Sequence, residues 1–216
     1  MNTIKTYEAR FVADAQIDLD GLLMEPAWAQ ANVERGFCFP WEDRSVPATE
    51  FRAVYDASAL YFSFRVEDDD VVLADPFQGK EDVMHEDRVE LFFALDEQLR
   101  RYFGLEIDPL GRVLDYRASH YRRFDVSWSF PGLDTAGIQT DNGYAVEGRI
   151  AWDQFQSLGF PPPDSGQAIK FGIYRAEFRH AEGAPYREGW ISWVDPRTEE
   201  PDFHVPESFG YLKLVT

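Results

Sequence analysis

The fold is decided most clearly by the stretch at residues 89–95, which reads VELFFAL. Its odd-numbered positions, from Val89 to Leu95, are all apolar, and side chains two residues apart lie on the same face of a β-strand. Residues 103–107, FGLEI, repeat this alternation, and residues 109–111, PLG, predict a turn after it. Both stretches therefore predict strands that turn one face towards an apolar core.

The same alternation of aromatic and β-branched residues recurs on both sides of this stretch. It predicts further strands at residues 49–56, 60–66, 113–116, 144–150, 169–178, 190–194 and 211–215. Helical turns are expected only at residues 25–31, which have a proline near the first helical position, and at residues 153–159, which end on a glycine. We therefore expect an all-β fold: one antiparallel β-sandwich domain over residues 1–216, with roughly ten strands and one or two short helices.

The chain is strongly acidic, with 39 Asp and Glu residues against 21 Lys and Arg residues and a formal net charge of −18. This charge repels phosphate backbones and anionic lipid surfaces, so we expect neither a nucleic acid nor a membrane partner, and acidic polysaccharides should be disfavoured. The single cysteine, Cys38, excludes an intramolecular disulfide. The sequence leaves the oligomeric state and the location open: cytoplasmic if Met1 is native, extracellular or periplasmic if a signal peptide was removed.

Catalytic motifs are missing from the sequence. Residues 85–89, HEDRV, begin like a zinc-protease helix, but the second histidine one turn later is absent. Patterns of the Gly-x-Ser-x-Gly, Gly-x-Gly-x-x-Gly and P-loop types are absent as well. We therefore expect a chain that is not an enzyme.

An acidic run directly follows one predicted strand, at Glu67, Asp68, Asp69 and Asp70. Adjacent carboxylates repel one another unless solvent or a cation screens them, and oxygen ligands suit Ca²⁺. Two interpretations stay open. The run is either a solvated turn or a structural Ca²⁺ site at Asp68, Asp69 and Asp70, and in the second case EDTA should lower the melting temperature.

Several sequence blocks occur in an order and spacing that resemble one family. These blocks are residues 17–21 with Glu25 and Trp28, 54–56 with 59–61, 86–92, 105–111, 143–147 with Ile150 and Trp152, and 209–212 with Trp193. Together they cover nearly the whole chain and resemble the family 9 carbohydrate-binding modules, a β-sandwich group related to the DOMON superfamily. The resemblance implies a non-catalytic module that binds a mono- or oligosaccharide and is commonly attached to polysaccharide-degrading enzymes.

The resemblance also indicates a binding site. In the family two tryptophans sandwich the sugar, and here Met84 occupies the first position while the loop of the second offers Phe203 and His204. Glu90 matches the acidic residue that contacts sugar hydroxyls, whereas Glu106 stands where the family has an arginine. Aromatic faces stack on the apolar face of a pyranose, and carboxylates bind its hydroxyls. The expected site for a neutral saccharide comprises Met84, His85, Glu90, Glu106, Tyr116, Phe203 and His204.

Two alternatives belong to other functional classes. DOMON relatives include haem b domains with methionine and histidine or lysine ligands, and Met84, His85 and His204 could be such ligands. Haem is the weaker alternative, because Met is often a core residue and His often a surface residue. A protein-interaction sandwich without a small ligand is the other, since both stacking tryptophans are replaced.

Overall fold

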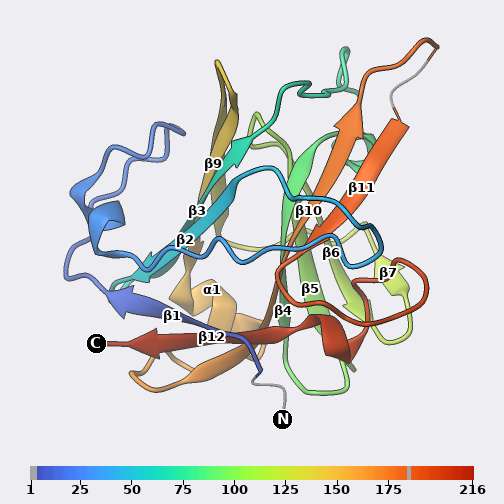
Figure 1. The fold of residues 1–216 in the computed structure, drawn as a ribbon. Coiled ribbons are helices and arrows are strands. Elements are labelled where there is room, and N and C mark those ends of the chain that lie inside the picture. Colours follow the sequence, from blue (N-terminus) through green and yellow to red (C-terminus); the bar gives the residue numbers. More distant parts are fainter. Residues whose placement is uncertain (1–3, 184–185) are drawn as a thin grey trace.

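The computed structural model describes residues 4–183 and 186–216, and strands dominate them (Figure 1). The strands are β1 (Thr6–Phe11), β2 (Thr49–Tyr55), β3 (Ala59–Glu67), β4 (Arg88–Ala94), β5 (Tyr102–Ile107), β6 (Val113–Ser119), β7 (Arg123–Asp125), β8 (Leu133–Thr140), β9 (Gly143–Ala151), β10 (Ala168–Arg179), β11 (Tyr186–Ser192) and β12 (Gly210–Val215). The helical elements are the 3₁₀ turns η1 (Pro26–Gln30), η2 (Lys80–His85) and η3 (Pro206–Ser208) and the helix α1 (Trp152–Ser157). The all-β prediction is confirmed.

A single hydrogen-bonded path connects the strands in the order β7-β6-β5-β4-β10-β12-β1-β2-β3-β9-β8, with β11 added beside β10. The sheet curls, so that β1, β2, β3 and β9 lie opposite β4, β5, β6 and β10 (Figure 1). The long strand β10 connects the two layers, because residues 168–171 pair with β12 and residues 170–176 pair with β4 on the other edge. Pairing is antiparallel except at β1, which runs parallel to both of its neighbours.

The main core fills the space between the two layers. Phe51 of β2 packs on Phe171 of β10 with ring centroids 5.8 Å apart, and Phe93 of β4 packs on the same ring at 5.0 Å. Val89 and Leu91 are fully buried in this core together with Phe93, as the alternation predicts. The hydrophobic effect on these aromatic faces is the main force that holds the layers together.

The opposite face of β4 is buried too. Phe92 belongs to a second apolar cluster that includes Tyr102, Tyr174 and Phe203. Phe203 comes from the segment between β11 and β12, and its ring stacks on Tyr174 with centroids 4.3 Å apart. This segment therefore covers the outer face of the β4–β5–β10 layer. In many antiparallel sheets that outer face is exposed to solvent.

A buried carboxylate connects three distant parts of the chain. Glu147 on β9 accepts hydrogen bonds from the backbone N–H groups of Asp20, at 3.1 Å, and Gly21, at 2.7 Å. Its other oxygen accepts the indole N–H of Trp28 at 3.0 Å. Gly21 has a φ of +81°, and a Cβ atom there would lie 2.9 Å from Ile138, so the turn requires glycine.

Most strand predictions are confirmed, and three strands were not predicted. β1, β7 and β8 mix polar and apolar residues, and β7 has only three residues. The turn expected at residues 25–31 is the 3₁₀ turn η1. The helix expected at residues 153–159 is α1, which begins one residue earlier, at Trp152, and ends at Ser157. In the described ranges, no helix has the length and apolar character needed to cross a membrane.

Candidate functional site

Three charged side chains meet on the outer face of β4 and β5. Glu90 and Glu106 are direct cross-strand partners in the antiparallel pair, which brings their carboxylates to the same face. Arg88 is two residues before Glu90, so it points the same way, and its Nε lies 3.0 Å from Glu90 Oε1 and 2.7 Å from Glu106 Oε2. All three are buried, with exposed fractions of 4%, 2% and 7% in chain order.

Two carboxylates share one guanidinium in this triad. Burial is the largest cause that raises the pKa of Glu90, to about 8; the carboxylate of Glu106 raises it further, and Arg88 opposes the shift. Arg88 also donates to the carbonyl oxygen of Met84 at 3.2 Å, which fixes the end of η2 against β4. The triad thus presents a donor and acceptors in fixed positions, which is the combination that binds hydroxyl groups.

The triad opens into a small pocket with a volume of about 80 Å³. The lining residues are Arg88, Glu90, Glu106, Arg122, Trp190, Pro201, Asp202, Phe203 and His204. Asp202 joins two sides of this pocket, because it accepts hydrogen bonds from the hydroxyl of Tyr121 at 2.6 Å and from Arg122 at 3.0 Å. The loop after β6 and the segment before β12 therefore meet at the pocket.

His204 and Tyr116 connect this pocket to the aromatic cluster beneath it. The ring of His204 stacks on Phe92 at 5.2 Å, and its Nδ1 shares a hydrogen bond of 3.0 Å with the Tyr102 hydroxyl. Burial, and then the charge of Arg122, lower the pKa of His204 to about 3, so this imidazole is neutral at pH 7. The hydroxyl of Tyr116 donates to Glu106 at 3.1 Å and thereby orients that carboxylate.

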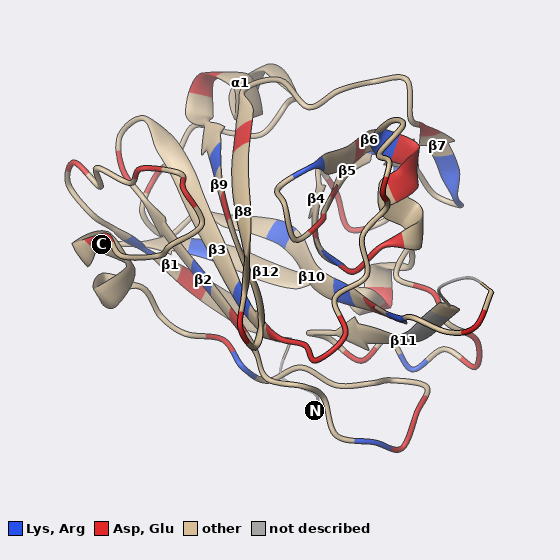
Figure 2. Cartoon of the chain, turned by 90° about the horizontal axis from the view of Figure 1, so that it is seen from above, with Lys and Arg blue, Asp and Glu red and all other residues tan. Residues whose placement is uncertain are grey.

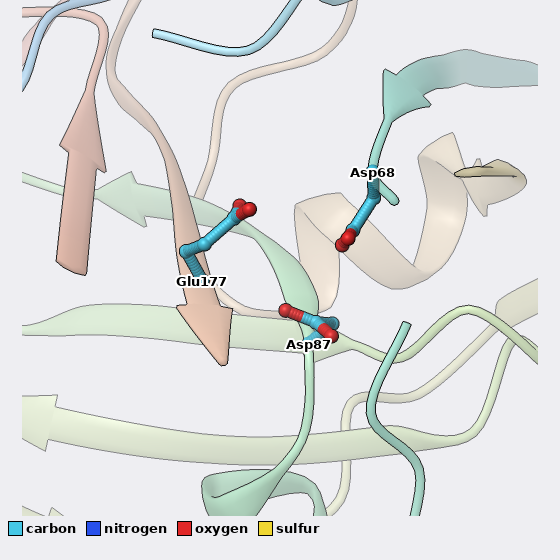
Figure 3. Close-up of side chains that lie close together, drawn as sticks. All are labelled: Asp68, Asp87 and Glu177. Atoms are coloured by element: carbon cyan, nitrogen blue, oxygen red, sulfur yellow. The ribbon is translucent and has the colours of Figure 1, made fainter. Parts of the chain in front are cut away.

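A second acidic group lies away from this pocket, at the end of β3 (Figure 3). Carboxylate oxygens of Asp68, Asp87 and Glu177 all lie within 4.8 Å of one another. Arg175 contacts this group, at 3.3 Å from Asp68 and in an ion pair with Glu177. Asp87 accepts the backbone N–H groups of Val72, at 2.6 Å, and of Phe178, at 2.7 Å, and burial followed by the charge of Asp68 raises its pKa to about 8.

A family model described as "Carbohydrate family 9 binding domain-like" matches residues 19–216. The chain belongs to this family. No curated protein matched the chain.

Solved structures share the family 9 fold at low sequence identity. A putative carbohydrate-binding protein from Bacteroides uniformis is 17% identical with a TM-score of 0.76, covering 98% of this chain and 100% of its own. A family 9 module from Caldicellulosiruptor kristjanssonii in complex with cellotriose is 17% identical with a TM-score of 0.64. The match covers 98% of this chain and 94% of that module. A family 9 module from the same organism in complex with glucose is 19% identical with a TM-score of 0.63. The match covers 97% of this chain and 95% of that module.

The structure brings together some of the residues that the family 9 resemblance indicated and separates others. Glu90, Glu106, Phe203 and His204 line the pocket, and Tyr116 lies directly beneath Glu106. Met84 and His85 lie on η2 with exposed side chains and are not among the lining residues.

Five lining residues were not predicted: Arg88, Arg122, Trp190, Pro201 and Asp202. Arg88 could have been found from the sequence, because it is two residues from Glu90 in a predicted strand and its side chain therefore lies on the same face. Arg122 and Asp202 are far apart in the sequence and meet only through the folding of two loops, so no local pattern marks them.

The acidic turn also differs from the expected arrangement. Asp68 points inward to Asp87 and Glu177, but Asp69 pairs with Arg179 at 2.9 Å. Asp70 instead accepts a hydrogen bond from the backbone N–H of His180 and shares one with its ring. The three adjacent aspartates thus contact different partners, and any ion bound here would involve Asp68 with residues from β10 and the start of β4.

Proposed function

We propose that this family 9 chain is a non-catalytic module that binds a neutral saccharide at the pocket formed by Arg88, Glu90 and Glu106. The observation that supports it is a built polar site: three charged side chains, each more than nine-tenths buried, at the floor of a pocket beside Trp190. Sugar hydroxyls can donate to the carboxylates and accept from the guanidinium. The complexes of related modules with glucose and cellotriose support a saccharide as the ligand class.

The size of the pocket limits how such a ligand enters. Pockets that enclose small molecules typically measure roughly 300 to 1,000 Å³, whereas this one measures about 80 Å³. One edge of a pyranose ring therefore reaches the triad, while the rest of the ring stays outside unless the contact between Arg122 and Asp202 opens. Trp190 lines the same pocket, and its indole would contact the apolar C–H face of that ring.

Isothermal titration calorimetry with glucose and cellotriose tests this proposal. Glu106→Gln should weaken binding at least tenfold, since it removes the negative charge and one of the two acceptor oxygens of a residue that lines the pocket. It should keep the fold, because Arg88 remains paired with Glu90. The matched control is Glu8→Gln at an exposed position on β1, which should leave the affinity unchanged.

Two outcomes would overturn the site. One is equal affinity in the wild type and in Glu106→Gln, which would place the saccharide elsewhere. The other is the absence of binding to neutral saccharides, which would favour the alternative of a protein-interaction sandwich.

The acidic group of Asp68, Asp87 and Glu177 already has partners within the protein. Arg175 already supplies a positive charge to Asp68 and Glu177, and both oxygens of Asp87 accept backbone N–H groups. A Ca²⁺ ion at this cluster would have to replace some of these contacts, so its binding should be measured directly by its effect on stability.

A further inference from the structure

A second and larger groove lies beside β5, β6, β7 and the end of α1, with a volume of about 510 Å³. Its lining residues are Arg100, Arg101, Phe103, Arg117, Ala118, Ser119, Arg123, Asp125, Trp128, Ser157 and Leu158. None of them lines the pocket around Glu90. β6 and β7 build its wall, because Arg117 pairs across the strands with Asp125, and Ser119 pairs with Arg123.

The groove is basic in a chain that is acidic overall. Four arginines line it against one aspartate, an excess of three positive charges, while the chain carries a net charge of −18. Figure 2 shows red segments over much of the chain and a blue segment on β7. Like charges this close repel one another, and a bound anion relieves that repulsion.

Two of these arginines are available to such an anion. Arg117 is paired with Asp125 at 2.8 Å, and Arg100 is paired with Asp96 at 3.3 Å. Arg101 and Arg123 are exposed and have no acidic partner in the part of the chain that the structure describes. Guanidinium groups bind carboxylates through two parallel hydrogen bonds, which gives direction as well as charge.

Trp128 adds a flat apolar surface and a hydrogen-bond donor to the same groove. Its ring packs against Phe103 at 5.2 Å and against Phe130 at 5.6 Å, so its position is fixed. Within the described residues its indole N–H has no acceptor. By contrast, four other tryptophans donate to a protein oxygen, namely Trp28, Trp41, Trp152 and Trp193.

We propose that this groove binds a sugar residue that carries a carboxylate, that is, a uronate unit of an acidic oligosaccharide. The carboxylate pairs with Arg101 and Arg123, and the sugar ring lies against Trp128. Because the Debye length is about 8 Å at physiological ionic strength, the local charge of the groove outweighs the distant acidic residues for a ligand seated in it. The expectation that acidic polysaccharides are disfavoured then applies to the rest of the surface and not to this groove.

Calorimetry with trigalacturonate, at low and at physiological salt, tests the proposal on the full chain. Trigalacturonate should bind, and added salt should weaken the affinity. The double variant Arg101→Gln/Arg123→Gln should lose at least tenfold in affinity, and Trp128→Phe should weaken binding by a smaller factor. The matched control, Arg10→Gln/Arg65→Gln, removes the same charge from exposed positions on β1 and β3 and should bind like the wild type.

Three results would overturn the proposal: no binding of trigalacturonate, the same affinity in Arg101→Gln/Arg123→Gln, or sodium sulfate binding as tightly as trigalacturonate. The last would mean an adventitious ion only. This site also stands apart from the neutral-saccharide pocket. Glu106→Gln should leave trigalacturonate binding unchanged, and Arg101→Gln/Arg123→Gln should leave cellotriose binding unchanged, so either site can fail without the other.

Discussion

Substitution of Arg88 by methionine should show how the buried triad is balanced. Arg88 is 4% exposed, and its Nε approaches carboxylate oxygens of both Glu90 and Glu106. In Arg88→Met two carboxylates remain directly opposite each other on β4 and β5 without a cation. Removal of one partner from a buried ion pair typically costs about 3–5 kcal/mol, and we expect a loss of that size in the free energy of unfolding at pH 8.

The loss should depend on pH with a definite sign. The folded state raises the pKa of Glu90 to about 8, above its unfolded value, so the folded state holds more protons over the interval between the two values. Stability from such a group is full at low pH and is lost as the pH rises through the folded pKa. Without Arg88 the folded pKa rises further, so the penalty should grow as the pH rises through about 8, by up to about 1.4 kcal/mol per pH unit for each proton involved.

Urea denaturation at pH 6, 7, 8 and 9 measures both effects. Arg88→Met/Glu106→Gln should recover most of the loss, because it leaves a single carboxyl group that can bind a proton. Arg100→Met is the control, since that side chain is exposed and pairs with Asp96 at 3.3 Å, and it should cost less than about 0.5 kcal/mol. A loss below about 1 kcal/mol at pH 8 that does not change with pH would refute the reasoning.

Three further predictions concern stability. Burial raises the pKa of Glu86 to about 7 and those of Asp87 and Glu90 to about 8, so the melting temperature should fall as the pH rises from 6.5 to 8.5; a flat or rising profile by scanning fluorimetry would contradict this. Phe203→Ala removes a ring stacked on Tyr174 at 4.3 Å and should cost about 3–5 kcal/mol in urea denaturation, whereas the exposed Leu110→Ala should cost far less. If Ca²⁺ binds near Asp68, saturation at one hundred times its Kd should add about 2.7 kcal/mol, and EDTA should lower the melting temperature; identical melting curves with Ca²⁺ and EDTA would reject the calcium prediction.

The sequence predicted the strands well because their signals are local. Alternation and turn residues mark β2 to β6 without knowledge of the rest of the chain. The position of β1 could not be predicted, because its mixed pattern is typical of no single element and its partners begin only at Thr49 and at Gly210. The burial of both faces of β4 also depends on a distant segment, the one that carries Phe203.

The residues that carry the family resemblance are largely structural. Glu147 holds the turn at Gly21, Asp87 accepts two backbone N–H groups, and Glu86 pairs with Arg112 at 2.7 Å. Such carboxylates maintain the fold whatever the ligand is, so the family can be recognised from residues that do not line the pocket. Met84 and His85, which the family resemblance included in the expected site, lie on a 3₁₀ turn, so strand alternation does not give the direction of their side chains.

The parallel pairing of β1 has a consequence for folding during synthesis. β1 begins at Thr6, whereas its partner β12 begins at Gly210, about 200 residues later. At a translation rate of roughly 5–20 residues per second, β1 waits about 10–40 s before that partner leaves the ribosome. During this time one edge of β1 has unpaired backbone groups that another chain could bind. Completion of the sheet is therefore a late and non-local step, and slow growth or chaperone supply should increase the soluble yield.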